Sequence, residues 1–147
     1  DNFIDVSFQF GWNIVGLPLE VEDPSYLTIF PDAIENTFFS FDGAYTPDSF
    51  MIEGEGYWLR FESAGNITIN GNSVNELTIS LNEGWNLISG VSTPLSISDI
   101  QDPDGIIISG TVYGFTSGSY LNTENIEPGK GYWVRANSSG SIILISE

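Results

Sequence analysis

Hydrophobic and polar residues alternate along most of the chain with a period of two, the period of a strand that buries one face. Turn-forming pairs such as Asp42-Gly43 and Ser117-Gly118 separate the alternating stretches. Two helical turns are expected at residues 25–30 and 96–100, each close behind a proline. The alternation predicts ten short strands, at residues 4–10, 12–17, 37–41, 56–62, 66–70, 76–81, 85–90, 105–115, 131–136 and 141–146.

Two sequence motifs occur twice in the same order. GWNIV at residues 11–15 returns as GWNLI at 84–88, and GEGYWLR at 54–60 returns as GKGYWVR at 129–135. All four tryptophans occupy equivalent positions, which indicates two copies of one unit, residues 1–72 and 73–147. We therefore expect an all-β fold of two pseudo-symmetric repeats of short antiparallel strands. The repeats would pack closely as β-sandwich or barrel halves, with one helical turn per repeat; two separate small barrels are the alternative.

The repeated residues have structural and functional interpretations. Trp12 and Trp85 are expected in the core, because equivalent core positions must fill the same volume in both copies; an exposed platform for sugar stacking is the alternative. The paired glycines before Tyr57 and Tyr132 lack the helix and Lys-Ser/Thr of a phosphate loop. They are expected to provide a positive φ or a close backbone approach.

Arg60 and Arg135 are two of only three cations in the chain, and they occupy equivalent positions. A structural role, with the guanidinium held by a carboxylate or by carbonyl oxygens and stacked on an aromatic ring, is favoured. The alternative is capture of a ligand carboxylate or sulfate, which the surrounding negative charge disfavours.

Aromatic residues near the two predicted hairpins are the candidates for ligand binding. Three phenylalanines of the first copy align with Gly114, Thr116 and Asn125 of the second, so aromatic side chains are in surplus in the first copy. Such residues could stack on sugars or anchor a protein partner, and a minor core at the junction of the copies is an equal alternative. The candidate ligand-binding residues are Phe39, Phe41, Tyr45, Phe50 and Tyr120.

Composition and charge exclude several classes of function. The 147 residues include 3 Lys and Arg against 20 Asp and Glu, a net charge of −17, with no Cys and no His. This charge disfavours binding to nucleic acid and to anionic lipid. Zinc sites, Cys-His pairs and Ser-His-Asp triads need residues that the chain lacks. No apolar run approaches the length of a membrane span, so we expect no membrane insertion.

The acidic residues suggest one metal site and no active site. Residues 102–105, Asp-Pro-Asp-Gly, match a fragment of a calcium-binding loop but lack its full spacing. A looser Ca²⁺ site at Asp99, Asp102 and Asp104 is the candidate, and no other cofactor is expected. Paired carboxylates could hydrolyse glycosides, but no motif places any of these acids, so we do not expect an enzyme.

LNEGWNLISG at residues 81–90, followed by VYGF at 112–115, Tyr120 and PGKGYWV at 128–134, resembles a tandem β-module of large secreted and cell-surface bacterial proteins. The first copy departs from this pattern at Glu53 and Glu55, where the second has Pro128 and Lys130. The resemblance implies an extracellular or cell-surface location, neighbouring domains in a larger chain and an accessory role without catalysis. We therefore expect a noncatalytic module that binds a polysaccharide; a structural or adhesive module that contacts surface proteins, stabilised by Ca²⁺, is the alternative.

Overall fold

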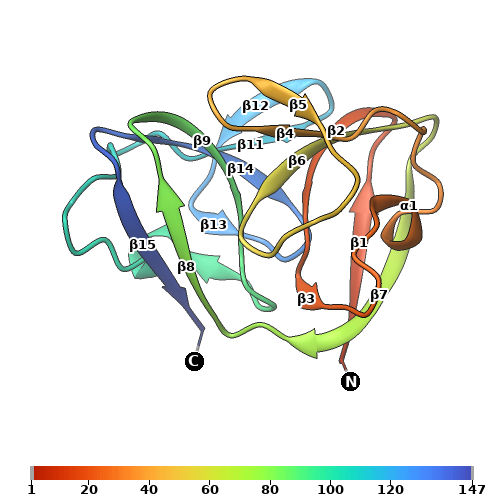
Figure 1. Cartoon of the computed structure of the whole chain (residues 1–147), viewed down its shortest axis with the longest axis horizontal. Helices are drawn as coiled ribbons and strands as arrows, with labels where there is room; N and C mark the ends of the chain where they lie inside the picture. Colours follow the sequence, from red (N-terminus) through yellow and green to blue (C-terminus); the bar gives the residue numbers. More distant parts are fainter. Residues whose placement is uncertain (1, 147) are drawn as a thin grey trace.

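A computed structural model describes residues 2–146, which form antiparallel sheets with one short helix and one 3₁₀ turn (Figure 1). The described residues contain no helix that is long and apolar enough to cross a membrane. The first half contains β1 (Asn2–Phe8), β2 (Gly11–Gly16), β3 (Leu19–Glu20), α1 (Tyr26–Ile29), β4 (Phe39–Phe41), β5 (Tyr45–Pro47), β6 (Gly56–Phe61) and β7 (Gly65–Ser73). The second contains β8 (Glu76–Leu81), β9 (Gly84–Ser89), β10 (Leu95–Ser96), the 3₁₀ turn η1 (Ile97–Asp99), β11 (Tyr113–Thr116), β12 (Ser119–Asn122), β13 (Asn125–Ile126), β14 (Gly131–Ala136) and β15 (Gly140–Ile145).

The two halves have the same strand order, so the predicted all-β fold of pseudo-symmetric repeats is confirmed. The first half has a sheet in the order β2-β6-β4-β5, and the second repeats it as β9-β14-β11-β12. Strands β1 and β7 form a second sheet with β3, and β8 and β15 form its equivalent. Figure 1 shows the halves side by side, with hairpins β4–β5 and β11–β12 together at the top and both chain ends at the bottom.

The strand predicted at residues 105–115 is much shorter than expected, since only Tyr113–Thr116 is extended. Ile106 and Val112 are buried, which explains the apolar pattern. Between them the chain turns at Gly110, which has a φ of 76°. The hydrophobic pattern of this segment therefore reflects a loop that packs on the core and not a strand.

Each half has its own hydrophobic core between its two sheets. In β6, Tyr57, Leu59 and Phe61 point into the core of the first half, and in β14 Tyr132 and Val134 point into the core of the second. This is the alternation expected of a strand with one face on the core. The other face of β6 and β14 is left free for contacts outside the core of each half.

The asparagine of each GWN motif holds the tight turn that precedes it. The Asn13 side chain accepts a hydrogen bond from the Gln9 N–H and donates to the Gln9 and Gly11 carbonyls, at 2.9 to 3.1 Å. Asn86 makes the same three bonds with Asn82 and Gly84. Because Asn13 and Asn86 are buried, these bonds satisfy polar groups that would otherwise be costly to remove from water.

The paired glycines of each half contact the opposite half. Gly54 and Gly129 have φ values of 91° and 83°, a region that favours glycine. A methyl group on Gly56 would lie 2.8 Å from the Ile88 carbonyl oxygen, and one on Gly131 would overlap Ile14 Cγ2. Both expectations for these glycines, positive φ and close approach, are confirmed.

The contacts between the halves are reciprocal. The Gly16 N–H donates to the Gly129 carbonyl at 3.1 Å, and the Ser89 N–H donates to the Gly54 carbonyl at 3.0 Å. Gly16 and Ser89 are equivalent residues, as are Gly54 and Gly129. A contact in which each half offers the same surface to the other is the mark of a two-fold relation. The two halves are therefore related by a pseudo-two-fold axis.

Lys130 adds a contact to one side of this joint. Its ammonium group donates to the Ser7 carbonyl of the first half. Burial lowers the pKa of Lys130, since the charged form is the one that burial penalises. Of the three cations in the chain, Lys130 thus belongs to the joint.

Gly56→Ala is expected to destabilise the protein by about 1–3 kcal/mol, because the added methyl group presses on the Ile88 backbone and neither strand can move freely. Gly114→Ala is the matched control, since its methyl group would lie 3.3 Å from Tyr132 Cε2, a tight contact with the edge of a side-chain ring and not with the backbone. We expect the control to change stability by about 1 kcal/mol or less. Urea denaturation measures both, and equal effects would contradict the tight joint.

Tyr57→Phe is expected to lower stability and to alter its alkaline pH dependence. The Tyr57 hydroxyl accepts the Ile52 N–H at 3.0 Å, and its loss leaves that N–H unpartnered, at a cost of about 1–3 kcal/mol. Burial raises the pKa of Tyr57, so above about pH 10 the unfolded tyrosine ionises while the folded one stays protonated.

Wild-type stability should therefore fall as the pH rises above the tyrosine pKa of the unfolded chain, and the fall should be shallower in Tyr57→Phe. Denaturation at neutral pH and at about pH 10 to 11 tests both parts. Tyr132→Phe is the equivalent variant in the second half, where the hydroxyl accepts the Glu127 N–H at 2.9 Å. An unchanged alkaline slope in both variants would rule out this role for the tyrosines.

Candidate functional site

One face of the β2–β6 pair leads from the joint between the halves to the top surface of the protein. From the joint outward, its cross-strand pairs are Gly16 with Gly56, Ile14 with Trp58, and Trp12 with Arg60. The β9–β14 pair repeats the arrangement with Ser89 and Gly131, Leu87 and Trp133, and Trp85 and Arg135. The residues of the GxGYWxR motif that do not point into the core of their own half therefore run from glycine through tryptophan to arginine.

The two hairpins at the top add the remaining aromatic residues. Phe39 of β4 pairs with Trp58, and Tyr113 of β11 pairs with Trp133. Phe39 is therefore equivalent to Tyr113, and Phe41 to Phe115. The alignment of Phe39 and Phe41 with Gly114 and Thr116 was wrong by one residue, so these two aromatic positions are shared by both halves and are not a surplus of the first.

Each hairpin packs against the tryptophan of the opposite half. The Phe41 ring lies 4.8 Å from the Trp133 ring, and the Phe115 ring lies 4.9 Å from the Trp58 ring, both edge to face. Ile14, Leu87 and Trp133 form the buried base of this cluster. The expected minor core at the junction of the halves is thus present beneath the hairpins.

Above this base the aromatic side chains form two adjoining pockets of about 460 and 520 Å³. We call their combined lining the aromatic surface. The first pocket is lined by Trp12, Phe39, Tyr45, Trp58, Phe115 and Tyr120. The second pocket is lined by Phe41, Tyr45, Trp85, Tyr113, Tyr120 and Trp133. Volumes of this size are typical of sites for small ligands.

The rings that wall the pockets are open to solvent. Tyr45 and Tyr120 are each 54% exposed, and Trp12 and Trp85 are 40% and 42% exposed. The expectation that Trp12 and Trp85 belong to the core is therefore wrong. Repetition in both halves does not by itself indicate burial, because here a pocket is repeated along with the core. Trp133, in contrast, is buried, at 9% exposed.

Four of the five candidate ligand-binding residues line the pockets, namely Phe39, Phe41, Tyr45 and Tyr120. The fifth, Phe50, is exposed but lines neither pocket. It forms a bridge with Ser25 at the entrance to α1. Stacking by Trp12 and Trp85 is only the alternative prediction from the sequence, and no such role is predicted for Trp58 and Trp133. These two tryptophans share a strand face with exposed arginines, which is a usable signal.

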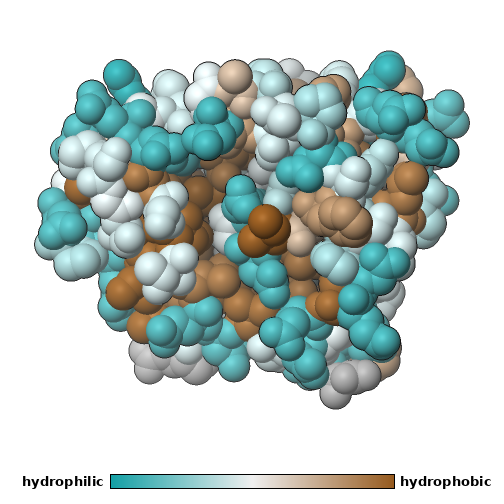
Figure 2. Space-filling model, in the orientation of Figure 1, coloured by the Kyte–Doolittle hydropathy of each residue, from teal (hydrophilic) through white to brown (hydrophobic). Residues whose placement is uncertain are grey.

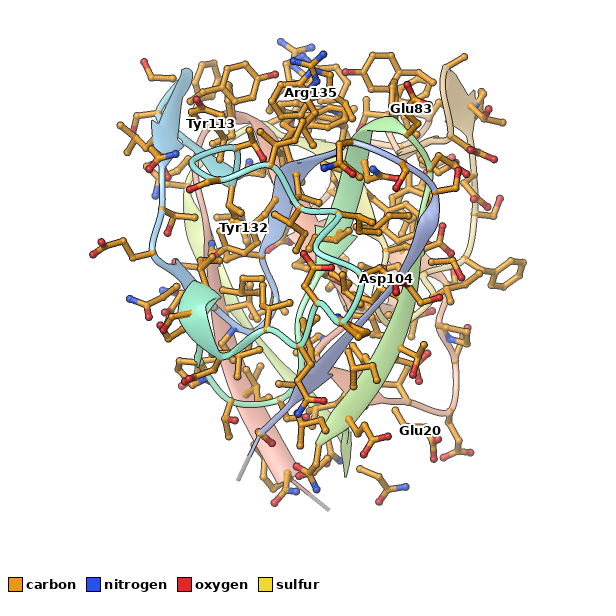
Figure 3. All side chains as sticks on the ribbon, turned by 90° about the vertical axis from the view of Figure 1, so that its left-hand side faces the viewer. Glu20, Glu83, Asp104, Tyr113, Tyr132 and Arg135 are labelled. Carbon is orange, nitrogen blue, oxygen red and sulfur yellow. The ribbon has the colours of Figure 1, made fainter. Side chains whose placement is uncertain are left out.

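An arginine borders each pocket. The Arg135 guanidinium lies 6.0 Å from the centre of the Trp85 ring, a cation–π contact. Figure 3 shows Arg135 among aromatic rings at the top of the molecule, with Tyr113 beside it. Arg60 occupies the equivalent position opposite Trp12. Stacking on an aromatic ring, part of the structural role expected for these arginines, is thus found at Arg135.

The Trp58 indole N–H is buried without a hydrogen-bond partner among residues 2–146. Its ring lies edge to face with Trp12, at 6.2 Å, and with Phe115, at 4.9 Å. An unpartnered buried N–H carries a desolvation cost, which aromatic ring faces nearby reduce in part. Trp58 therefore contributes its ring, and not its polar group, to the first pocket.

The hairpin β4–β5 is tied to the second half by a polar contact. The Asn82 side-chain amide donates to the Asp42 carboxylate at 2.9 Å, joining the hairpin turn to the turn before β9. Asp42 and Asn82 are exposed, so this bond adds more to the position of the hairpin than to stability. The hairpin carries Phe41 and Tyr45, which line the second pocket together with residues of the second half. The bond between Asn82 and Asp42 therefore helps to position these two rings.

Figure 2 shows the face of Figure 1 by hydropathy, with strongly hydrophobic residues in its middle and lower parts and a more polar upper edge. The aromatic surface lies toward that upper edge, where Trp and Tyr are intermediate on the scale. Hydropathy alone therefore does not mark the pockets.

The candidate calcium site is not assembled as a cluster. Among residues 2–146, no group of three or more acidic, His or Cys side chains is placed to hold a metal ion. The Asp102 carboxylate accepts the N–H groups of Ile106 and Ile107, each at 2.9 Å, while Asp99 and Asp104 are exposed. The structure thus gives Asp102 a role in holding the loop after η1 and does not bring the three aspartates together.

Comparison with protein-family models, with curated proteins and with solved structures gave no match for this chain. The fold and the pockets are therefore the basis for a functional assignment.

Asp102→Ala is expected to lower the free energy of unfolding by about 1–3 kcal/mol, because two backbone N–H groups lose their acceptor. The loss should be the same in Ca²⁺ and in EGTA. Asp104→Ala is the matched control, since this exposed side chain should change stability by about 0.5 kcal/mol or less. If instead Ca²⁺ raised the melting temperature of the wild type but of neither variant, a calcium site would be established.

Proposed function

We propose that this chain is a noncatalytic accessory module that binds carbohydrate through its aromatic surface. The observation that carries the proposal is the pair of adjoining pockets whose lining side chains are aromatic. Sugar rings have faces of C–H groups that pack on aromatic rings, and hydroxyl groups at their edges that stay in contact with water. An open, aromatic-lined surface suits such a ligand, since it buries the C–H faces and leaves the hydroxyls solvated.

The charges around the pockets support a ligand rich in hydrogen-bonding groups. Arg60 and Arg135 border the aromatic surface, and their guanidinium groups carry several N–H donors. Sugar hydroxyls accept such bonds without the need for a net charge. A neutral saccharide also avoids repulsion by the −17 charge of the protein, which would disfavour an anionic ligand.

The composition of the pocket walls supports binding without catalysis. Glycoside hydrolysis requires two carboxyl groups on opposite sides of the bond to be cleaved. The described residues that line the two pockets are all Trp, Tyr and Phe. We therefore assign the pockets to recognition of a saccharide. Any hydrolysis of that saccharide would be the task of neighbouring domains of a larger chain.

An extracellular or cell-surface location belongs to the same proposal. The support for this location is the repeated motif, which resembles a module of secreted bacterial proteins. At such a location the module would bind polysaccharides outside the cell.

A structural or adhesive module that contacts surface proteins is the second candidate. Large hydrophobic side chains outside the pockets favour it, since Phe3, Phe10 and Phe50 are 69%, 71% and 57% exposed. Exposed aromatic residues of this kind anchor protein partners. Calcium would enter this alternative only through the loop acids Asp99, Asp102 and Asp104.

Tyr45→Ala is expected to weaken saccharide binding by about tenfold, the effect of losing a contact worth roughly 1.4 kcal/mol, because Tyr45 lines both pockets. Phe50→Ala is the matched control and should bind as the wild type does, since Phe50 is equally exposed but lines neither pocket. Affinity electrophoresis on a panel of soluble glucans, mannans, xylans and chitin oligomers measures both variants.

Retardation of the wild type that Tyr45→Ala loses and Phe50→Ala keeps would support the carbohydrate module. Retardation by none of the polysaccharides, or retardation lost equally in both variants, would contradict it. The first of these contrary results would favour the adhesive alternative.

A further inference from the structure

We propose that the two pockets are equivalent sugar subsites related by the pseudo-two-fold axis, so that the module binds two short saccharides, or one long chain in either direction. This inference rests on the proposed function, because it takes carbohydrate as the ligand. It adds the number of subsites, their relation and the class of chain they accept.

The two linings are equivalent residue by residue. The pseudo-two-fold axis exchanges Trp12 with Trp85, Trp58 with Trp133, Phe39 with Tyr113, Phe41 with Phe115, and Tyr45 with Tyr120. Applied to the first pocket, this exchange gives the lining of the second, residue for residue. Each pocket takes three rings from its own β2–β6–β4 or β9–β14–β11 sheet and a phenylalanine from the opposite hairpin, while both tyrosines are shared.

The ring geometry is equivalent as well. Trp12 and Trp58 lie 6.2 Å apart at 89°, and Trp85 and Trp133 lie 6.3 Å apart at 85°. The contact between the opposite hairpin and the buried tryptophan differs by 0.1 Å between the pockets, 4.9 Å against 4.8 Å. The two pockets differ in one ring, Phe39 in the first against Tyr113 in the second, and otherwise have the same residues in the same arrangement. They should therefore bind the same chemical group with similar affinity.

The direction of a bound chain follows from the symmetry. Both pockets open on the one end of the molecule that carries hairpins β4–β5 and β11–β12 (Figure 1), so the axis that exchanges them emerges through this surface between them. A half-turn about such an axis reverses any line drawn from one pocket to the other. A saccharide chain has a reducing and a non-reducing end, so it meets the two pockets in opposite senses.

This reversal restricts the ligand that both pockets can accept. Directional hydrogen bonds to one face of a sugar would be satisfied in one pocket and lost in the other. Stacking on C–H faces survives the reversal, because a flat chain of sugars with equatorial hydroxyls offers similar faces in both senses. The ligand class is therefore an unbranched chain of equatorially substituted pyranoses, such as β-1,4-linked glucose, N-acetylglucosamine or xylose.

The shared tyrosines make the two subsites contiguous. Tyr45 and Tyr120 line both pockets and stand between them, each 54% exposed. Arg60 and Arg135 are the cross-strand partners of Trp12 and Trp85, so one arginine stands beside each pocket. A chain of several sugars can thus cross from one arginine to the other, whereas a short saccharide fills one subsite.

The test is an NMR titration of the indole N–H signals of Trp12 and Trp85 in the intact chain. The probes are the disaccharides and hexasaccharides of β-1,4-linked glucose, N-acetylglucosamine and xylose. A disaccharide should shift both signals with dissociation constants that agree within about threefold, and the hexasaccharide should saturate at one ligand per chain. A spin label at the reducing end of the hexasaccharide should broaden both signals, because the chain binds in both directions.

Trp85→Ala should abolish the second subsite and leave the Trp12 response to the disaccharide unchanged. The wild-type titration decides the matter even if this variant does not fold. A disaccharide that shifts only one of the two signals, or a spin label that broadens only one, would overturn the two-subsite inference while leaving carbohydrate binding intact. Absence of any shift with all six probes would overturn both the inference and the proposed function.

Discussion

The close approach of two backbones, which only glycine allows, is the constraint on which the structure depends. Gly56 lies against Ile88, and Gly131 lies against Ile14 and Val15, so neither half could carry a side chain there without moving the other away. The hydrogen bonds from Gly16 to Gly129 and from Ser89 to Gly54 then fix the register between the halves. A unit of about 73 residues can form only a small core, and contact with its own duplicate stabilises it further.

The same strand face supports both the joint and the pockets. On β6 and β14 the residues outside the core of each half run from the glycine at the joint, through a tryptophan, to an arginine at the outer end. The distance between the halves at the glycines therefore sets how far each hairpin can reach over the tryptophan of the opposite half. Phe41 on Trp133 and Phe115 on Trp58 are contacts of this kind, and they wall the pockets. Duplication has produced a surface that neither half could form alone.

The sequence was sufficient to predict the fold and four of the residues that line the pockets, but not the role of the tryptophans in them. Strand alternation and the repeated motifs identified the architecture, and strands such as Glu76–Leu81 and Gly131–Ala136 fall where the pattern placed them. The apolar pattern at residues 105–112 predicts a strand, but these residues form a loop whose apolar side chains also lie on the core. A shift of one residue between β4 and β11 hid the match of Phe39 to Tyr113, and only strand pairing with Trp58 and Trp133 revealed it. Whether a tryptophan such as Trp12 is buried depends on the opposite half, which no local pattern encodes.

Hydrogen exchange of the native protein tests most directly whether the two halves form one cooperative unit. The Gly16 and Ser89 amides donate across the joint, so they exchange only when the halves separate. If the joint holds the fold together, both amides should exchange with the free energy of global unfolding, equal to that of core amides in the β1–β7 and β8–β15 sheets. Exchange of these two amides at a much lower free energy, with each half retaining its own protected core, would show that the halves are separate domains and would contradict a pocket built by both.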